Sequence, residues 1–333
     1  MSEIRQNVAI REWVIIASER ARRPHEFIQK KKVDKEPPEY VETCPFCPGN
    51  EHLAPPEVFS LRDEHNEWLV RCIPNKFAAV STQGALLHQD EGIKRRMSGV
   101  GLHEVIVETP HHSLVTALMD DQQVVKILEA YKCRYLEALG DDRIELVIIF
   151  KNHGQSAGTS LEHPHSQLIA IPVVPQHVRD RMEEAMRFYD DHRRCVFCDM
   201  LKEEIRLKER VILESADFVA FTPYAALSPF HTWILPKRHM SSFTQIDETE
   251  MRDFAGILRK VLKKIYVGLN DPDFNYVIRS IPAPYGETSF FHWYLSIVPR
   301  VSLAAGFELG SGMFINTSIP EENAAFLKGI AVD

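Results

Sequence analysis

The amino-acid sequence predicts an α+β protein made of two copies of one unit, each an antiparallel sheet that carries a long helix. Three observations support this class. C-x-x-C pairs occur twice, at 44–47 and 195–198; a strand-like run that ends in a histidine follows each pair; and an amphipathic helical pattern follows each run. The chain of 333 residues is long enough for about two such units and can bury a large core without disulfide bonds.

The same elements recur in the same order in both halves. A strand-like run ending in a histidine comes first, then an amphipathic helix with an acidic start, a β-rich run, and a closing strand led by a histidine. These elements lie at about 103–112, 120–139, 144–152 and 163–171, and again at about 231–239, 247–269, 274–281 and 292–298. The repeated order indicates an internal duplication.

The halves also set the expected domain boundaries. We expect an N-terminal half over 1–172, a helical connector over 173–194 and a C-terminal half over 195–333. The connector is strongly charged and has helical spacing from 176 to 194. A stretch rich in lysine, glutamate and proline at 29–42 is predicted to be a solvated loop.

Charge and hydropathy exclude several classes of protein. The chain has 39 Lys and Arg against 47 Asp and Glu, a net charge of −8, whereas general nucleic-acid binders show a basic face. No apolar run approaches the roughly 20 residues that a membrane-spanning helix needs. The N-terminal stretch carries charges where a secretion signal has an apolar core. We therefore expect a cytoplasmic protein without nucleic-acid or membrane partners.

Four of the six cysteines form the two C-x-x-C pairs, which in a reducing compartment are more often metal ligands or redox centres than disulfides. Two cysteines and two histidines form a set that zinc prefers. A buried turn with unrelated histidines is the alternative, and the matching order of the two sets disfavours it. We predict two structural zinc ions per chain, held by Cys44, Cys47, His112 and His163, and by Cys195, Cys198, His239 and His292. Cys72 and Cys133 are interpreted as packing residues, Cys133 on an apolar helix face.

Some histidines near these sets need a separate interpretation. His111 and His112 would point to opposite faces of a strand, so only one of them can be a ligand. The parallel with His239 favours His112, and a shift by one position is the alternative. His103 and His231 correspond to each other at the starts of their strands, and we interpret both as structural residues.

The chemistry is expected where the two copies differ. The first half carries NHGQSAGTSLEHPHSQ at 152–167, and the second carries YGETSFFHWY at 285–294, so that Tyr294 stands where the first half has His165. Imidazole is a good nucleophile at neutral pH and can form a covalent intermediate. The preceding Gly-Thr-Ser offers N–H and hydroxyl groups of the kind that hold phosphate oxygens. The pattern indicates attack by His165 on a phosphorus atom.

These motifs resemble the galactose-1-phosphate uridylyltransferase family, a branch of the histidine triad superfamily. The resemblance spans nearly the whole chain and includes EWVIIASERARRP, CPFCPGNE, NKFAAV, VETPHHS, the segment around HPHSQ, and GFELGSG. It implies a duplicated histidine-triad-like fold and a two-step ping-pong reaction through a nucleotidyl-His165. It also implies nucleotide sugars with sugar phosphates or phosphate as substrates, and a homodimer.

The resemblance further implies roles for individual residues. Gln167 stands where hydrolytic relatives have a third histidine. A neutral amide can hydrogen-bond a phosphoryl oxygen but protonates a leaving group poorly, so the covalent intermediate would survive until an acceptor arrives. Glu308 matches a residue that contacts hexose hydroxyls. Contacts to nucleotide and phosphates are implied for Arg20, Arg23, Asn75, Phe77, Asn152, Gly158, Thr159 and Ser160.

Three departures separate this chain from the best-known uridylyltransferases. Thr159 replaces a cysteine, Phe314 aligns with a sugar-binding glutamine, and the second metal set contains cysteines instead of a carboxylate and several histidines. These departures resemble the branch that includes ADP-glucose phosphorylase. We expect a UDP-glucose:hexose-1-phosphate (galactose 1-phosphate) uridylyltransferase, with an adenylyltransferase that uses phosphate as acceptor as the alternative. A binding module and a dinucleoside polyphosphate hydrolase are disfavoured by His165 and Gln167, respectively.

Overall fold

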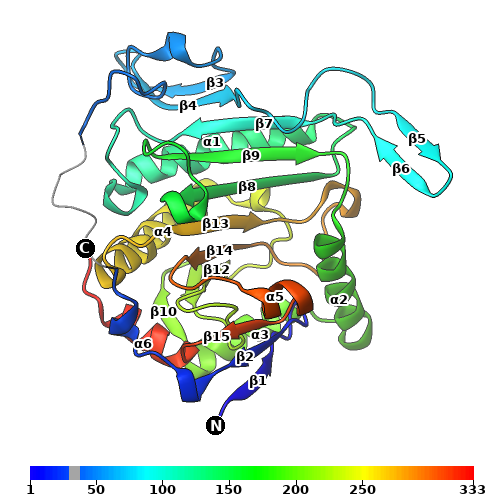
Figure 1. Cartoon of the computed structure of the whole chain (residues 1–333), viewed down its shortest axis with the longest axis vertical. Coiled ribbons are helices and arrows are strands. Elements are labelled where there is room, and N and C mark those ends of the chain that lie inside the picture. Colours follow the sequence, from blue (N-terminus) through cyan, green and yellow to red (C-terminus); the bar gives the residue numbers. More distant parts are fainter. Residues whose placement is uncertain (30–37) are drawn as a thin grey trace.

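A computed structural model describes residues 1–29 and 38–333, and these residues form one ten-stranded antiparallel sheet that runs through the whole molecule (Figure 1). Every neighbouring pair of strands in it is antiparallel. In order across the sheet, the strands are β3 (Phe59–Arg62), β4 (Trp68–Pro74), β7 (Leu102–Val107), β9 (His165–Ile171), β8 (Leu146–His153), β13 (Phe274–Arg279), β14 (Tyr294–Pro299), β12 (Thr232–Pro236), β11 (Phe218–Phe221) and β10 (Val211–Glu214).

The strand order is symmetric about the central pair β8 and β13. On each side of that pair the remaining strands follow in the same relative order, so β9 corresponds to β14 and β7 corresponds to β12. The central register pairs Ile149 with Ile278 and His153 with Phe274. The α+β class is confirmed. The two expected sheets are continuous because pairing β8 with β13 removes one exposed edge from each half.

Two long helices cover one face of this sheet, as the apolar spacing predicted. Helix α1 (Asp121–Leu139) packs against α4 (Glu248–Leu269), and both contribute to the largest buried core. Asp120 and Asp247 cap them with their side chains; the first accepts a hydrogen bond from the Gln123 N–H at 2.7 Å. Both carboxylates satisfy N–H groups that the first helical turn leaves unpaired.

The opposite face of the C-terminal half is covered by the connector. The predicted connector helix is α2 (Gln176–His192), and it ends two residues before the predicted boundary. Helix α3 (Val196–Leu207), which the sequence did not predict, begins directly at Cys195. The two helices share a buried cluster with Trp233 and Tyr294 of the sheet. This packing places the start of α3, and with it the second C-x-x-C pair, against the sheet.

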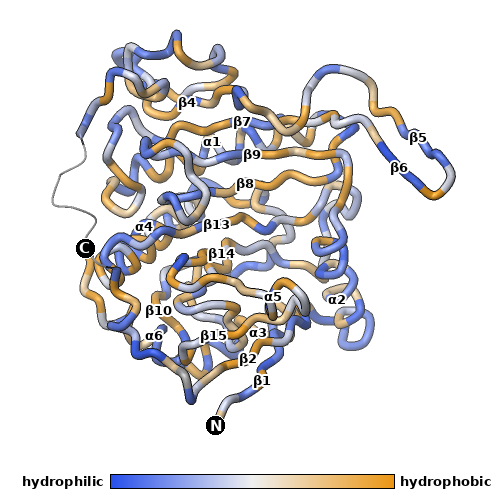
Figure 2. The backbone as a smooth tube through the Cα atoms, in the orientation of Figure 1, coloured by the Kyte–Doolittle hydropathy of each residue, from blue (hydrophilic) through white to orange (hydrophobic). Residues whose placement is uncertain are grey.

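Smaller elements complete the described chain. The segments near the two ends form a second sheet, and a hairpin of exposed residues projects from the body (Figure 1). Figure 2 shows hydrophobic residues along the central strands and hydrophilic ones over β6 and much of α2. The elements are β1 (Glu3–Gln6), β2 (Trp13–Ile16), β15 (Phe314–Asn316), β5 (His88–Glu91), β6 (Lys94–Met97), α5 (Gly306–Ser311), α6 (Pro320–Gly329), and the 3-10 helices η1 (Ser18–Arg20), η2 (Pro24–Phe27), η3 (Glu51–Leu53), η4 (Thr116–Leu118), η5 (Gln155–Ala157), η6 (Phe243–Gln245) and η7 (Ala283–Tyr285).

Several local expectations differ from the structure. The run 103–112 leaves the sheet after Val107, so His112 lies in a turn and the argument from alternating strand faces does not apply to it. Cys72 is buried as predicted, but Cys133 is exposed because it lies outside the buried stripe of α1. Within the predicted loop 29–42, residues 30–37 lie outside the described residues. No helix among the described residues combines the length and apolarity needed to cross a membrane.

Candidate active site and metal centres

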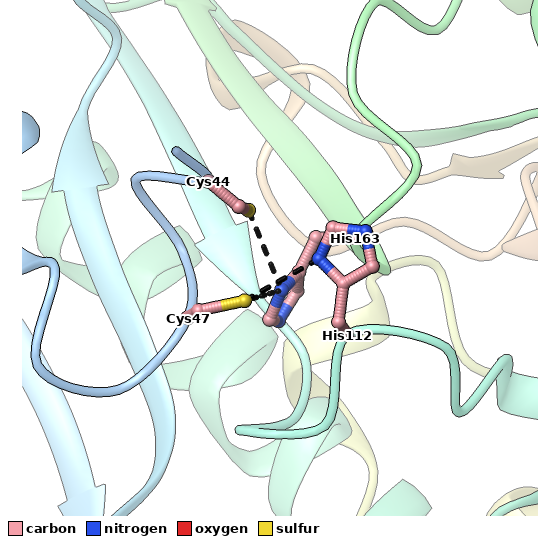
Figure 3. Close-up of side chains that lie close together, drawn as sticks. All are labelled: Cys44, Cys47, His112 and His163. Carbon is pink, nitrogen blue, oxygen red and sulfur yellow. Dashed lines mark hydrogen bonds between the residues drawn. The ribbon is translucent and has the colours of Figure 1, made fainter. Parts of the chain in front are cut away.

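The first cysteine and histidine set comes together as predicted, and all four side chains are buried. Cys44 and Cys47 lie in the loop before η3, His112 in the turn after β7, and His163 just before β9 (Figure 3). The Cys47 Sγ is 3.3 Å from His112 Nδ1 and 3.6 Å from His163 Nδ1, and the Cys44 Sγ is 3.7 Å from His163 Nδ1. One potential donor atom from each residue lies within 4.8 Å of all the others.

These distances fit a tetrahedral zinc site. Zinc bonds of about 2.3 Å to sulfur and about 2.0–2.1 Å to nitrogen imply sulfur–nitrogen separations of roughly 3.6 Å. The His163 Nε2–H donates to the carbonyl of Thr109 at 2.7 Å, which leaves Nδ1 facing the sulfur atoms. Burial lowers the pKa of His163 to about 4, so the imidazole has the neutral form that a metal ligand needs.

The second set is also brought together. Cys195 and Cys198 lie at the start of α3, His239 follows β12, and His292 lies just before β14. The Cys198 Sγ lies 3.2 Å from His239 Nδ1 and 3.4 Å from His292 Nδ1, and Cys195 completes the group. His239 Nε2 donates to the Thr288 carbonyl at 3.0 Å, as His163 does to its own backbone partner. Both predicted donor sets can therefore hold a metal ion.

His165 begins β9, next to the first metal set. Its Nδ1–H donates to the carbonyl of His163 at 2.7 Å, so the backbone of a candidate metal ligand orients the ring. Among the described residues, Nε2 has no hydrogen-bond partner. Burial lowers the pKa of His165, and the nearby Lys151 ammonium adds to this effect. The ring is therefore neutral at physiological pH, with the lone pair on Nε2.

Gln167 lies two residues further along β9, and a histidine holds its amide. The Ala79 N–H donates to His103 Nδ1 at 3.0 Å, so His103 Nε2 carries the proton and donates to Gln167 Oε1 at 2.9 Å. The Asn75 Nδ2 donates to the same oxygen at 3.4 Å, while Asn75 Oδ1 accepts from the Phe77 N–H at 2.8 Å. The oxygen of the amide is occupied, and its NH₂ group is the end left to bind a ligand.

From the sequence, His103 was interpreted only as a structural residue. The correspondence of His103 and His231 was the signal that could have identified it. In the second half, His231 Nε2 lies 2.8 Å from the hydroxyl of Ser296, which occupies the position of Gln167. In each half, a histidine thus links two neighbouring strands: His103 links β7 to β9, and His231 links the start of β12 to β14.

The glycine-rich segment lies beside His165. Extending the β8–β9 register, which pairs Phe150 with Gln167, places Asn152 opposite His165. Gly158 has a φ of +92°, and a Cβ there would lie 3.8 Å from the amide nitrogen of Asn152. Thr159 is half-buried and its hydroxyl donates to the Leu161 carbonyl at 3.1 Å, whereas Ser160 is exposed. The segment therefore presents backbone and hydroxyl groups next to the histidine.

A buried polar network lies beneath this segment. The Lys151 Nζ is 2.5 Å from Glu108 Oε2 and donates to the His165 carbonyl at 3.4 Å. Glu108 also accepts from Thr116 Oγ1 at 2.9 Å and from the Tyr131 hydroxyl at 3.2 Å. Burial alone would raise the pKa of Glu108, but Lys151 and these hydrogen bonds lower it overall. The ion pair joins the residue after β7 to β8, and the Lys151 hydrogen bond to the His165 carbonyl extends the network to β9.

Other residues implied by the family resemblance lie elsewhere in the chain. Phe77 is 85% exposed beside Asn75. Arg23 is exposed at the N-cap of η2, which packs against α6 in the C-terminal half. Glu308 is exposed on α5, where its carboxylate accepts a hydrogen bond from the Ala305 N–H at 2.9 Å. In Figure 1, β14 lies between α5 and the part of the sheet that contains β9. The Arg20 side chain lies outside the described part of the structure.

Comparisons with known proteins agree with this geometry. Models of the N-terminal and C-terminal domains of galactose-1-phosphate uridyl transferase match residues 1–175 and 181–300, respectively. ADP-glucose phosphorylase from Arabidopsis thaliana is 37% identical over 336 residues, which cover 99% of this chain and 93% of that protein. Galactose-1-phosphate uridylyltransferase from Thermotoga maritima is 29% identical over 343 residues, covering 100% of both chains.

Solved structures show the same fold over the full length. A crystal structure of the Arabidopsis thaliana ADP-glucose phosphorylase with bound ADP-glucose superimposes with a TM-score of 0.84 at 34% identity, covering 100% of both chains. A uridylyltransferase structure superimposes with a TM-score of 0.75 at 26% identity, covering 98% of this chain and 97% of the other. The chain belongs to the galactose-1-phosphate uridylyltransferase family of nucleotidyl-transferring enzymes.

Proposed function

We propose that the protein transfers an adenylyl group from ADP-glucose to phosphate through a covalent adenylyl-His165, as an ADP-glucose phosphorylase would. The observation that carries the covalent step is the hydrogen bond from His165 Nδ1 to the His163 carbonyl, which directs the lone pair to Nε2. The similarity to a relative with that name, at 37% identity, supports adenine and phosphate over the uridylyl reaction that we expected from the sequence.

The first step forms a nitrogen–phosphorus bond. The Nε2 lone pair of His165 attacks the α-phosphorus of ADP-glucose, the bond to the bridging oxygen breaks, and glucose 1-phosphate leaves with its electrons. The Nδ1 proton stays in place because the His163 carbonyl holds it at 2.7 Å. In the second step an oxygen of inorganic phosphate attacks the same phosphorus, and ADP leaves as Nε2 regains its lone pair.

Gln167 would stabilise the charge that develops on the phosphoryl oxygens. His103 and Asn75 occupy its Oε1, so its Nε2 hydrogens would point to the ligand. An amide has no titratable proton to give to a leaving group, and the adenylyl-enzyme would persist until phosphate arrives. We assign phosphate contacts to Asn152, Gly158, Thr159 and Ser160, which lie beside His165, and place the base near Phe77.

The proposed substrate contacts of Arg20, Arg23 and Glu308 require a second copy of the chain. Arg23 precedes η2 as its N-cap and Glu308 lies on α5, and these helices pack against α6 and β15, outside the β9 region of the same chain. We propose a homodimer in which these residues of one protomer complete the site of its partner. We also propose that both cysteine–histidine sets hold structural zinc, because their donor types and separations fit it.

Uridylyl transfer from UDP-glucose to galactose 1-phosphate is the second candidate. The match of both domain models and the similarity to the Thermotoga maritima enzyme favour it. Phe314, which packs beside Val14 in the small sheet, is a departure from the best-known uridylyltransferases that resembles the ADP-glucose phosphorylase branch.

Product analysis with two substrate pairs tests the proposal. Purified protein is incubated with ADP-glucose and phosphate, and separately with UDP-glucose and galactose 1-phosphate, with His165→Ala as control. We expect ADP and glucose 1-phosphate from the first pair at the higher kcat/KM, and no turnover by the variant. Nucleotide release at the same rate without any acceptor would show a hydrolase and would contradict the proposal.

A further inference from the structure

The second half keeps a counterpart of the region around His165. Tyr294 corresponds to His165, and the β13–β14 register pairs it directly with Arg279. In the first half the same register position opposite His165 belongs to Asn152, which we assign to phosphate binding. The duplication has therefore replaced a histidine and an amide by a tyrosine and an arginine at equivalent positions. The nucleophile is lost, and a positive charge is gained.

Among the described residues, Arg279 has no hydrogen-bonded partner for its charge, and the one carboxylate that acts on it, Glu12, already pairs with another arginine. The Arg279 Nε is buried, and among the described residues its guanidinium forms no hydrogen bond and no ion pair. Directly paired residues of neighbouring antiparallel strands project to the same face of a sheet, so Arg279 lies on the face of Tyr294, which α2 covers. Leaving a guanidinium unpaired at a covered position is unfavourable unless an anion neutralises it.

A second arginine reaches the same place from α2. Arg181 is only 8% exposed; its Nη1 donates to the Tyr294 hydroxyl at 3.3 Å and its Nη2 to Glu12 Oε1 at 3.2 Å. The Arg181 Nε is buried without a hydrogen-bond partner. Proximity to Arg181, in addition to burial, lowers the pKa of Arg279, as expected for two neighbouring cations. Two guanidinium groups thus share one carboxylate.

His177, which also contacts Arg181, does not supply the missing negative charge. His177 Nε2 lies 2.7 Å from Arg181 Nη2, and burial and Arg181 lower the His177 pKa, which keeps its ring neutral. The His177 side chain is 61% exposed, so the cluster borders solvent on this side. The cluster of Arg181, Arg279 and Glu12 therefore has a net charge of +1 and at least two unused N–H donors.

We propose that Arg181 and Arg279 bind a phosphate group, either inorganic phosphate or a phosphate monoester, in the C-terminal half at the counterpart of the proposed phosphoryl site. Guanidinium donors match the oxygens of phosphate in geometry and charge. The Tyr294 hydroxyl, already bonded to Arg181, is a further polar group at the site. The site binds but does not react, because a tyrosine replaces the nucleophile. It does not depend on covalent chemistry at His165.

Equilibrium dialysis with radiolabelled phosphate tests this site in the full-length protein. The variants are Arg279→Gln, Arg279→Lys, and the control Arg300→Gln, which removes an exposed arginine whose side chain has no hydrogen bond among the described residues. We expect Arg279→Gln to bind one phosphate fewer per chain, or to bind it roughly ten- to a hundredfold more weakly. Arg279→Lys should bind phosphate more tightly than Arg279→Gln and less tightly than the wild type, because it keeps the charge but not the paired guanidinium donors, and Arg300→Gln should match the wild type.

Further measurements separate this site from the first one. Arg279→Gln should still form the nucleotidyl adduct, whereas His165→Ala should lose the adduct and keep the phosphate that depends on Arg279. Unlabelled phosphate and glucose 1-phosphate as competitors identify the free anion or the ester as the preferred ligand. Identical phosphate binding by Arg279→Gln and Arg300→Gln, with both folded by their thermal transitions, would overturn the proposal.

Discussion

Lys151→Met is the substitution whose consequence follows most directly from the buried network under His165. Lys151 is 2% exposed and Glu108 is 0% exposed, and their charged atoms are 2.5 Å apart. Methionine has a similar volume but no charge, so the substitution would leave the Glu108 carboxylate in the core without its cation. Thr116 and Tyr131 would still donate to it.

The expected loss of stability is about 3–5 kcal/mol, the range found when one partner of a buried ion pair is removed. The double variant Lys151→Met with Glu108→Gln should regain most of this loss. Its neutral amide can keep the hydrogen bonds from Thr116 and Tyr131 without needing a cation. Because each single variant leaves one buried charge unpaired and the double variant leaves none, the two substitutions should be non-additive, with a coupling energy at or above the upper end of the usual range of about 0.5–3 kcal/mol.

The pH dependence has a defined sign. In the wild type the pKa of Glu108 is lowered in the fold, so the ion pair stabilises the protein above the ordinary carboxyl range and less as pH falls through it. In Lys151→Met, burial without the cation raises that pKa, so the carboxyl group can take up a proton. The difference in unfolding free energy between the two proteins should therefore be largest near neutral pH and shrink toward acidic pH.

Urea unfolding followed by circular dichroism measures these differences in the wild type and all three variants. Unchanged m-values would show that unfolding exposes the same amount of surface in the wild type and in every variant. A cost below about 1 kcal/mol for Lys151→Met would refute the assignment of a buried ion pair, because exposed pairs contribute no more than that. A double variant as unstable as the sum of the two single variants would refute the coupling.

Three further predictions concern the proposed zinc sites, the proposed nucleophile His165 and the support of Gln167 by His103. Elemental analysis should find two zinc ions per chain, and Cys198→Ser should leave about one, because removing a thiolate opens a tetrahedral site; two ions in the variant would contradict the ligand assignment. The rate of adduct formation should stay level as pH falls to the ordinary histidine pKa of 6.5 and decline only below it, because burial lowers the pKa of His165; an inflection above 6.5 in pre-steady-state kinetics would contradict this. His103→Phe should reduce kcat more than it changes KM, by roughly 5- to 30-fold for one lost hydrogen bond to Gln167, while an unchanged kcat would show that the amide needs no support.

Local chemistry made much of the fold predictable. Asp120 and Asp247 cap the two long helices at the predicted starts, since an acidic residue before an apolar helical pattern satisfies the first free N–H groups. The metal sets were predictable because the duplication repeats their order, although His112 lies in a turn and not in the expected strand. The repeated pattern thus pointed to two groups of residues that the fold brings together and that no local spacing would have joined.

Contacts between distant strands could not be read from one sequence. The role of His103 depends on β7 lying beside β9, which brings its ring to Gln167 from 64 residues away. The pairing of Arg279 with Tyr294 depends likewise on strand register. The edge strands β3 and β10 are short and partly polar, and their apolar alternation is too weak to predict them.

The intact mass of the protein after incubation with ADP-glucose in the absence of phosphate tests the central claim most directly. The account predicts a mass increase of one AMP per chain, located on the peptide that contains His165 and removed when phosphate is added. The variant His165→Ala should show no such increase. An unmodified wild-type protein that still converts ADP-glucose, or an AMP adduct that persists in His165→Ala, would contradict the covalent mechanism.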